Sequence, residues 1–205
     1  METGETGLLS RFPWVARRPL TVAEYHRMGE VGILAERDRV ELIEGELVAM
    51  SPIGSRHAGT VNALNRLIVS AVGERAVVSV QNPIQLDDRT EPEPDIAVLK
   101  PRQDDYRQAT PRPDDVLLVI EVADTSVEYD RTVKLPLYAG HGIPEVWIVN
   151  LVAAEVEVWR TPAGDRYESV LRLGRGATSR FCASDGGRLW RWRACLVRFS
   201  RLPRC

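Results

Sequence analysis

The hydrophobic and polar positions in the first part of the chain predict two helices separated by a hairpin. The first helix is expected to begin at Thr21, because Thr21 and Glu24 have the spacing of a capping box. The second is expected over residues 55–72, where apolar residues recur at helical spacing and Gly73 follows as a C′ residue. Between them, two apolar runs around a central glycine predict a β-hairpin over residues 40–50.

The second part of the chain is dominated by predicted strands. Residues 116–120 are all apolar and mostly β-branched, which indicates a strand covered on both faces, and a short helix follows it. A polar surface loop is expected at residues 100–115. The other predicted strands are 76–86 (an edge strand or a bulge, because of Pro83), 95–99, 144–150, 156–160 and 167–173. This order predicts an α/β or α+β domain with a central mixed sheet flanked by helices.

Length and composition limit the classes of protein to consider. The 205 residues are enough for one domain with a sizeable core, and we divide them into a leader (1–20), a domain (21–176) and a tail (177–205). The net charge of −2 supplies no global field for nucleic acid, so such a contact needs a local basic groove. No secretory segment or bilayer-spanning apolar run is present, which predicts a cytoplasmic protein with no membrane partner.

The tail is rich in Arg, Trp and Cys and shows no clean period. All three cysteines lie in it, and their number and spacing fit neither a disulfide framework nor a metal site. One interpretation of Arg191, Trp192 and Arg193 is a cation–π cluster on nucleic acid. The alternatives are a disordered tail or the product of a frame change near the end of the coding sequence.

Two carboxylates lie at the ends of predicted strands. Glu121 directly follows five apolar residues, and a buried carboxylate is costly unless a cation meets it. Asp95 opens another predicted strand, although an Asp after Pro is also common in turns. Carboxylates at the ends of adjacent strands can hold Mg²⁺ or Mn²⁺, which prefer oxygen ligands. The pattern therefore predicts a metal site that activates water and offsets charge on a scissile phosphate.

Lys134 is the candidate cation for this site. The chain has two lysines, Lys100 and Lys134, and otherwise uses arginine, so a retained lysine indicates a need for a compact ammonium. Asp130 and Lys134 stand at positions i and i+4, so one interpretation is a simple ion pair within a helix. The other directs Lys134 at the metal site, where it would orient the attacking water or stabilise the pentavalent transition state.

Taken together, these segments resemble the Uma-two family of bacterial restriction-endonuclease-like proteins, within the PD-(D/E)xK phosphodiesterase superfamily. The resemblance covers about residues 20–173. It rests on the following motifs: Pro94-Asp95, Val119-Ile120-Glu121-Val122, Asp130-xxx-Lys134-xxx-Tyr138, the segment 142–149, the segment 41–46 and His57.

The resemblance implies a restriction-endonuclease-like core and Mg²⁺-dependent hydrolysis of DNA. It also implies that Asp95 and Glu121 are catalytic metal ligands. In the superfamily the lysine usually lies two residues after the second acid, where this chain has Ala123. The resemblance therefore implies that the lysine has moved to Lys134 on the following helix.

The same resemblance extends to residues around this trio. It implies that an upstream acid, Glu41 or Glu44, completes the site, with Asp130 and Tyr138 in supporting positions. His57 fits the pattern, although a histidine near a helix start is more often a surface or cap residue. A homodimer would suit the cutting of both strands of a duplex.

Pro136 is a departure from the family pattern. Outside the first turn of a helix it would remove a hydrogen bond and kink the segment, which would displace Lys134. Pro136 and the atypical tail together support an alternative function, that of a catalytically inactive protein of the same fold that binds nucleic acid or another protein. A nucleotide-binding enzyme is not indicated, because the sequence lacks a GxxxxGK[ST] phosphate loop.

Overall fold

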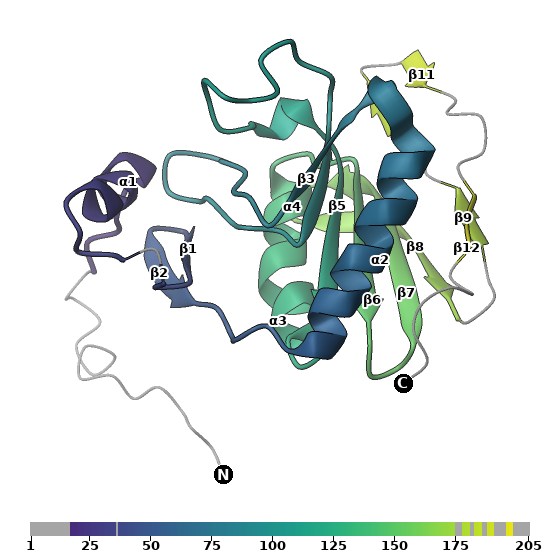
Figure 1. Ribbon diagram of the computed structural model, residues 1–205, viewed down its shortest axis with the longest axis horizontal. Helices are drawn as coiled ribbons and strands as arrows, with labels where there is room; N and C mark the ends of the chain where they lie inside the picture. The colour runs from purple at the N-terminus through teal and green to yellow at the C-terminus, as the bar shows by residue number, and fades with distance from the viewer. Residues whose placement is uncertain are drawn as a thin grey trace.

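The computed structural model describes residues 17–35 and 37–174, together with four short strands between residues 178 and 198. Most of the predicted leader and much of the predicted tail, including the Arg191-Trp192-Arg193 cluster, lie outside the described residues, and the domain division remains a prediction. The main sheet has six strands. Figure 1 shows helices on both of its faces. The predicted fold class, a mixed sheet flanked by helices, is confirmed.

The elements follow the chain in the order of their labels in Figure 1. The helices are α1 (Val22–Glu30), α2 (Ser55–Val72), α3 (Val127–Tyr129), the π-helical turn η4 (Asp130–Lys134) and α4 (Leu135–Gly140), with short 3₁₀ turns η2 (Gly73–Arg75) and η3 (Pro113–Asp115). The strands of the main sheet are β3 (Val77–Val80), β4 (Ile96–Leu99), β5 (Val116–Ala123), β6 (Glu145–Asn150), β7 (Glu155–Ala163) and β8 (Arg166–Leu173). The short strands are β1 (Val40–Ile43), β2 (Glu46–Ala49), β9 (Thr178–Arg180), β10 (Ala183–Asp185), β11 (Arg188–Trp190) and β12 (Leu196–Arg198). Among the helices described, none has the length and apolar character needed to cross a membrane.

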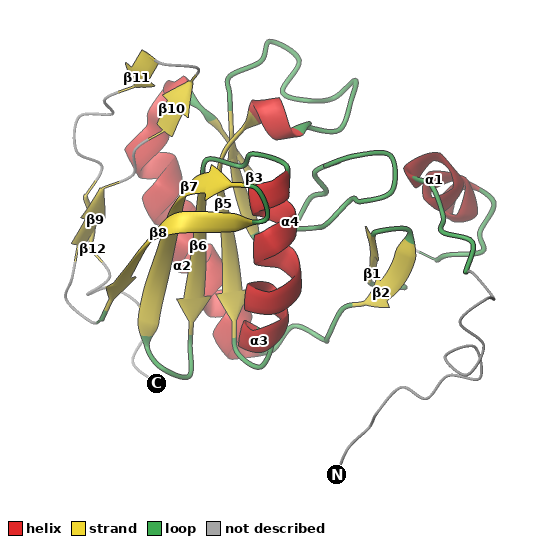
Figure 2. Ribbon diagram, turned by 180° about the vertical axis from the view of Figure 1, so that it is seen from behind, coloured by secondary structure: helices red, strands yellow, loops and turns green. Residues whose placement is uncertain are grey.

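The main sheet has the strand order β3-β4-β5-β6-β7-β8. β5 and β6 are parallel, and every other neighbouring pair in this sheet is antiparallel. A parallel pair needs a crossover connection, which here is made by α3, η4 and α4. Figures 1 and 2 show α2 on one face of the sheet and this crossover on the other. The connection that carries Lys134 is therefore pressed against the sheet.

The two faces of the sheet form two hydrophobic clusters. On one face, Leu64 and Ile68 of α2 pack against a cluster that includes Leu118 and Trp147. On the opposite face, Tyr138 of α4 lies in a second cluster with residues of β4, β5 and β6. Because β4, β5 and β6 are covered on both sides, all of their residues are buried. For β5 this confirms the prediction made from the apolar run at residues 116–120. Any charged side chain in these strands must find a partner inside the protein.

Most of the predicted elements are confirmed, with one strand shorter than expected. α1 has the capping box of Thr21 and Glu24, and α2 spans the predicted residues and ends at Gly73, which has a positive φ of 56°. The strand predicted at residues 76–86 lies at the edge of the sheet, as expected from Pro83, but it ends at Val80. Gln81 has φ 51°, so the backbone leaves the extended conformation there.

The helix that carries Lys134 differs from the expected regular α-helix. The N–H of Leu135 donates to the carbonyl of Asp130, five residues earlier, which makes residues 130–134 a π-turn. Pro136 lies in the first turn of α4, where its lack of an N–H is tolerated. The sequence predicted that Pro136 would displace Lys134 only if it lay outside a first turn. Pro136 lies in a first turn, and Lys134 remains buried and ion-paired.

Candidate active site

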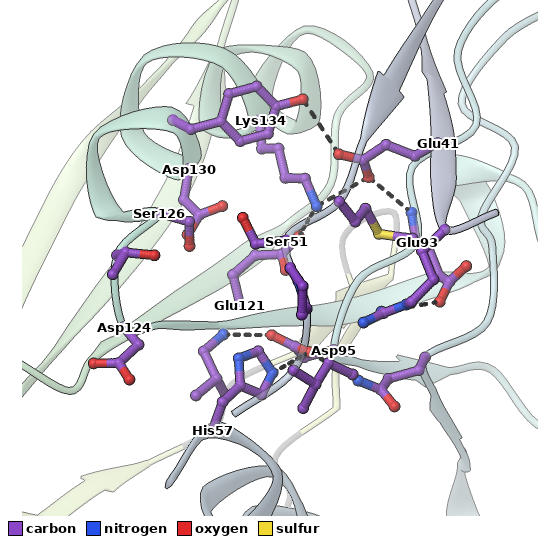
Figure 3. A pocket seen from close by; sticks show the side chains of 18 of the residues that line it. Glu41, Ser51, His57, Glu93, Asp95, Glu121, Asp124, Ser126, Asp130 and Lys134 are labelled. Atoms are coloured by element: carbon purple, nitrogen blue, oxygen red, sulfur yellow. Dashed lines mark hydrogen bonds and ion pairs between the residues drawn. The ribbon is translucent and has the colours of Figure 1, made fainter. Parts of the chain in front are cut away.

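A cavity of about 450 Å³ opens where the β1–β2 hairpin, the start of α2, the end of β5 and the turn η4 meet. Figure 3 shows its side chains approaching from all of these elements. The carboxylates that line it are Glu41, Glu93, Asp95, Glu121, Asp124 and Asp130. The cations that line it are Arg39 and Lys134, and His57 also contributes. The lining is therefore strongly acidic.

The register of β4 against β5 brings the two predicted metal ligands to the same end of the sheet. These strands are antiparallel and pair Ile96 with Ile120, so Asp95 and Glu121 each lie one residue beyond this pair. One carboxylate oxygen of Asp95, Oδ2, accepts a hydrogen bond of 2.8 Å from the N–H of Val122. Two acids that are 26 positions apart in the sequence are therefore held beside each other by strand pairing.

Lys134 is buried between two carboxylates. Its Nζ lies 3.1 Å from Glu41 Oε2 and 3.3 Å from Glu121 Oε1, and 7% of its side chain is exposed. Burial would lower the pKa of Lys134, but the adjacent Glu121 and Glu41 carboxylates raise it overall. The ammonium therefore stays charged and supplies the cation that the buried Glu121 requires.

Glu121 is held by two side chains of the crossover. The hydroxyl of Tyr138 donates a hydrogen bond of 2.6 Å to the same oxygen, Oε1, that Lys134 contacts. Burial raises the pKa of Glu121, and the adjacent Lys134 ammonium opposes this rise. Tyr138, predicted as a supporting residue, thus fixes the orientation of the carboxylate.

Asp95 and His57 form a second pair in the cavity. His57 Nε2 lies 2.7 Å from Asp95 Oδ1, and Gln81 Nε2 donates to that oxygen at 3.4 Å. The hydrogen bond to Asp95 raises the pKa of His57, with burial partly opposing it. His57 therefore lies in the cavity rather than on the open surface, and it contacts one of the two predicted metal ligands.

Of the two upstream acids, the structure brings Glu41 into the cavity and leaves Glu44 outside. Glu41 is buried in β1, where its Oε1 accepts from the hydroxyl of Tyr129 at 3.2 Å and its Oε2 from the N–H of Glu93 at 3.2 Å. Glu44 is exposed at the hairpin turn with φ 50°, and it does not line the cavity. Glu41 lies within β1, whereas Glu44 lies beyond its end in the exposed turn, and this gives the two glutamates different surroundings.

Asp130 lines the cavity without pairing directly with Lys134. Its Oδ2 accepts a hydrogen bond of 2.9 Å from Ser126 Oγ, and burial raises its pKa. Lys134 instead pairs with Glu41 and Glu121, which lie on other elements. Among the described residues, the interpretation of Asp130 and Lys134 as a simple ion pair within one helix is therefore wrong. Asp130 adds to the negative charge around the ammonium.

Sequence reasoning did not identify Tyr129, Glu93 or Arg39. Tyr129 immediately precedes Asp130, and Glu93 immediately precedes the Pro94-Asp95 motif, so neighbouring positions were the available signal. Their contacts join distant segments, as with Tyr129 and Glu41, which are separated by 88 positions. Nothing in local periodicity reports such contacts.

The donor set fits a magnesium-type ion. In the described part of the chain, no three His, Cys, Asp or Glu side chains meet as a preformed metal site. Mg²⁺, however, typically takes only one or two protein carboxylates and completes its shell with water and substrate phosphate. Asp95 and Glu121 offer such oxygens in a cavity where carboxylates outnumber cations. A divalent cation would offset that excess.

Comparison with solved structures supports the fold. A crystal structure from Anabaena variabilis, described as "a putative nuclease belonging to DUF820", matches with a TM-score of 0.63 and 19% sequence identity. The match covers 78% of this chain and 88% of that chain. At this identity the match shows the fold alone, and the fold is the predicted restriction-endonuclease-like core. None of the curated proteins compared with the sequence matches it.

Comparison with models of protein families identifies the family of this chain. The model of the Uma2 family, described as "Putative restriction endonuclease", matches residues 22–183. This range contains every residue placed in the cavity above and most of the chain. The chain therefore belongs to the Uma2 family.

Proposed function

We propose that the protein is a metal-dependent endonuclease that hydrolyses phosphodiester bonds of DNA. The observation that carries this proposal is the Lys134 ammonium, buried at 3.1 Å from Glu41 and 3.3 Å from Glu121 in the cavity that Asp95 also lines. Family membership supports nuclease chemistry. The choice of DNA rests on the family description alone.

In this proposal Asp95 and Glu121 hold Mg²⁺ or Mn²⁺, which supplies an activated water and charge neutralisation when bound. The chain's own residues orient these ligands. Tyr138 fixes Glu121 by its hydrogen bond, and the Val122 N–H and His57 fix Asp95. Removal of a hydrogen bond that orients a metal ligand typically lowers metal affinity or activity 10–100-fold.

Lys134 has an electrostatic role in this proposal. Its ammonium is held rigidly by Glu41 and Glu121, so little reorganisation is needed when negative charge develops on the phosphate. Glu41 is itself fixed by Tyr129 and by the N–H of Glu93. Lys134 thus positions the attacking water and stabilises the pentavalent transition state.

The experiment is cleavage of supercoiled plasmid DNA by the purified protein with Mg²⁺. We expect Lys134→Ala and Asp95→Ala each to lower the rate at least about 100-fold, as loss of a preorganised charge typically does. Lys100→Ala is the matched control, because Lys100 is the other lysine of the chain and does not line the cavity. Cleavage that survives both cavity substitutions would overturn the proposal.

The alternative of a catalytically inactive binding protein loses one of its motivations. It was motivated in part by the expected effect of Pro136 on Lys134, and Lys134 keeps two ion pairs. Calorimetric titration with Mn²⁺ separates the two functions, because an inactive descendant would show no binding that Glu121→Ala abolishes. A homodimer remains a prediction, to be tested by the mass in solution.

A further inference from the structure

The cations of the cavity differ in how far they are already engaged. Lys134 is enclosed by two carboxylates, and His57 is hydrogen bonded to Asp95. The guanidinium of Arg39 lies 4.0 Å from Glu93 Oε1, the longest ion pair among the described residues, and it makes no hydrogen bond to that carboxylate. Its guanidinium therefore keeps donors that a new ligand can use.

Arg39 stands at the rim of the cavity on a fixed backbone. It directly precedes β1, and its carbonyl accepts a hydrogen bond of 2.9 Å from the N–H of Met50 across the hairpin. Its side chain is 34% exposed, whereas that of Lys134 is 7% exposed. A ligand entering the cavity can therefore reach the guanidinium without unfolding the hairpin.

A second cavity of about 600 Å³ adjoins the active-site cavity. Arg39, Met50 and Glu93 line both cavities, so Arg39 lies at their border. The second cavity is also lined by Asp38 and by Glu91, which is buried. His26 also lines the second cavity and is already engaged by Glu91, at 2.7 Å, so Arg39 is the cation there with the loosest ion pair.

We infer that Arg39 is a substrate-binding residue that takes a non-scissile phosphate of a nucleic-acid strand, and that Glu93 releases it when the phosphate arrives. This inference rests on the proposed function. A guanidinium matches phosphate geometry with two parallel N–H donors, which the loose contact with Glu93 leaves unused. In the free protein Glu93 competes for Arg39, so binding exchanges a long ion pair for a bidentate contact.

The test is fluorescence anisotropy with a labelled single-stranded oligodeoxynucleotide and Ca²⁺ as the divalent cation, with strand integrity checked on a gel. We expect Arg39→Ala to raise the Kd about tenfold or more, the typical weight of a charge-assisted contact. The slope of log K against log salt should fall by about 0.7, the value for one contact to a single strand. Arg39→Lys should recover part of the affinity, because it keeps the charge but not the fork.

Two further variants separate phosphate binding from a structural role. Glu93→Gln should tighten binding about two- to fivefold, because it removes the carboxylate that competes with the phosphate for Arg39. Arg27→Ala is the matched control, since Arg27 is an exposed arginine with its own carboxylate partner, Glu30, outside both cavities. Thermal unfolding of each variant checks that it folds. If Arg39→Ala does not fold, Arg39→Gln takes its place.

The inference is overturned if Arg39→Ala leaves both the Kd and the salt slope equal to those of Arg27→Ala. It is also overturned if Glu93→Gln weakens binding, which would mean that the Arg39–Glu93 pair serves only to hold the hairpin. Because the readout is binding, the result stands apart from the nuclease test. Loss of binding in Arg39→Ala alongside absent cleavage would reject the proposed catalysis while keeping the phosphate site.

Discussion

At the scale of the residue, the cavity depends on hydrogen bonds that fix three carboxylates. Asp95, Glu121 and Glu41 each accept from a neighbouring side chain, so none is free to rotate away from the cavity. Sequence reasoning identified Asp95 and Glu121 because each stands at a strand whose apolar character makes a carboxylate expensive. It left Glu41 and Glu44 as alternatives, and their different exposure distinguishes them.

The hydroxyl of Tyr138 gives the first prediction. Tyr138→Phe removes the hydrogen bond of 2.6 Å to Glu121, so the carboxylate becomes less well oriented. We expect the Mg²⁺ concentration for half-maximal cleavage to rise about tenfold. Tyr106→Phe is the control, because its hydroxyl bonds the carbonyl of Lys100 outside the active-site cavity. An equal shift in both variants would contradict the role given to Tyr138.

His57 gives a prediction about pH. The hydrogen bond to Asp95 raises the folded-state pKa of His57 above its ordinary value of 6.5, so protonation of His57 stabilises the folded state. This stabilisation is fully present below about pH 6.5 and is lost as pH rises through the folded-state pKa. His57→Gln should therefore lower the unfolding temperature more at about pH 5.5, where His57 is protonated, than at about pH 9, where it is neutral. A larger loss at pH 9 would contradict the pairing with Asp95.

At the scale of the element, most helices and strands followed from periodicity, and the exceptions have local causes. β3 ends early because Gln81 adopts a positive φ, which no hydrophobic pattern encodes. The π-turn could not be predicted, because the pattern of apolar and polar residues over one turn does not distinguish π-helical from α-helical geometry. Pro136 was the local signal that a new helical segment begins there. It was interpreted from the sequence as a residue that could displace Lys134, whereas it lies in the first turn of α4.

Pro136 gives the prediction at this scale. Because it lies in the first turn of α4, Pro136→Ala should change the free energy of unfolding by about 1 kcal/mol or less. The rate of plasmid cleavage should stay close to that of the wild type, because the ion pairs of Lys134 remain. Chemical denaturation and the plasmid assay measure the two effects. A marked gain in rate would mean that Pro136 does misplace Lys134.

At the scale of the whole molecule, the site lies where the sheet, the crossover and the hairpin converge (Figure 3). The strands of the main sheet lie side by side in the order of the chain, but local patterns did not show that β5 and β6 are parallel while their neighbours are antiparallel. Local patterns predicted the mixed sheet flanked by helices, and the family resemblance added the restriction-endonuclease-like core. Since acids outnumber cations in the cavity, a bound divalent cation should stabilise the entire domain.

Metal-linked stability is the prediction for the whole molecule. Saturating Mg²⁺ should raise the free energy of unfolding of the wild type, by about 2.7 kcal/mol at a concentration 100 times the Kd. Asp95→Asn should lose this gain, because one of the two carboxylates is removed. Differential scanning calorimetry with and without Mg²⁺ measures both proteins. An equal gain in the variant would place the ion elsewhere.

The most direct measurement is the single-turnover cleavage rate of plasmid DNA by Lys134→Ala beside Lys100→Ala at saturating Mg²⁺. The account predicts that the first variant loses at least about 100-fold while the second keeps the wild-type rate. Calorimetry must show that both variants are folded, because removing Lys134 leaves Glu41 and Glu121 buried without their cation. Equal rates for the two folded variants would contradict the account.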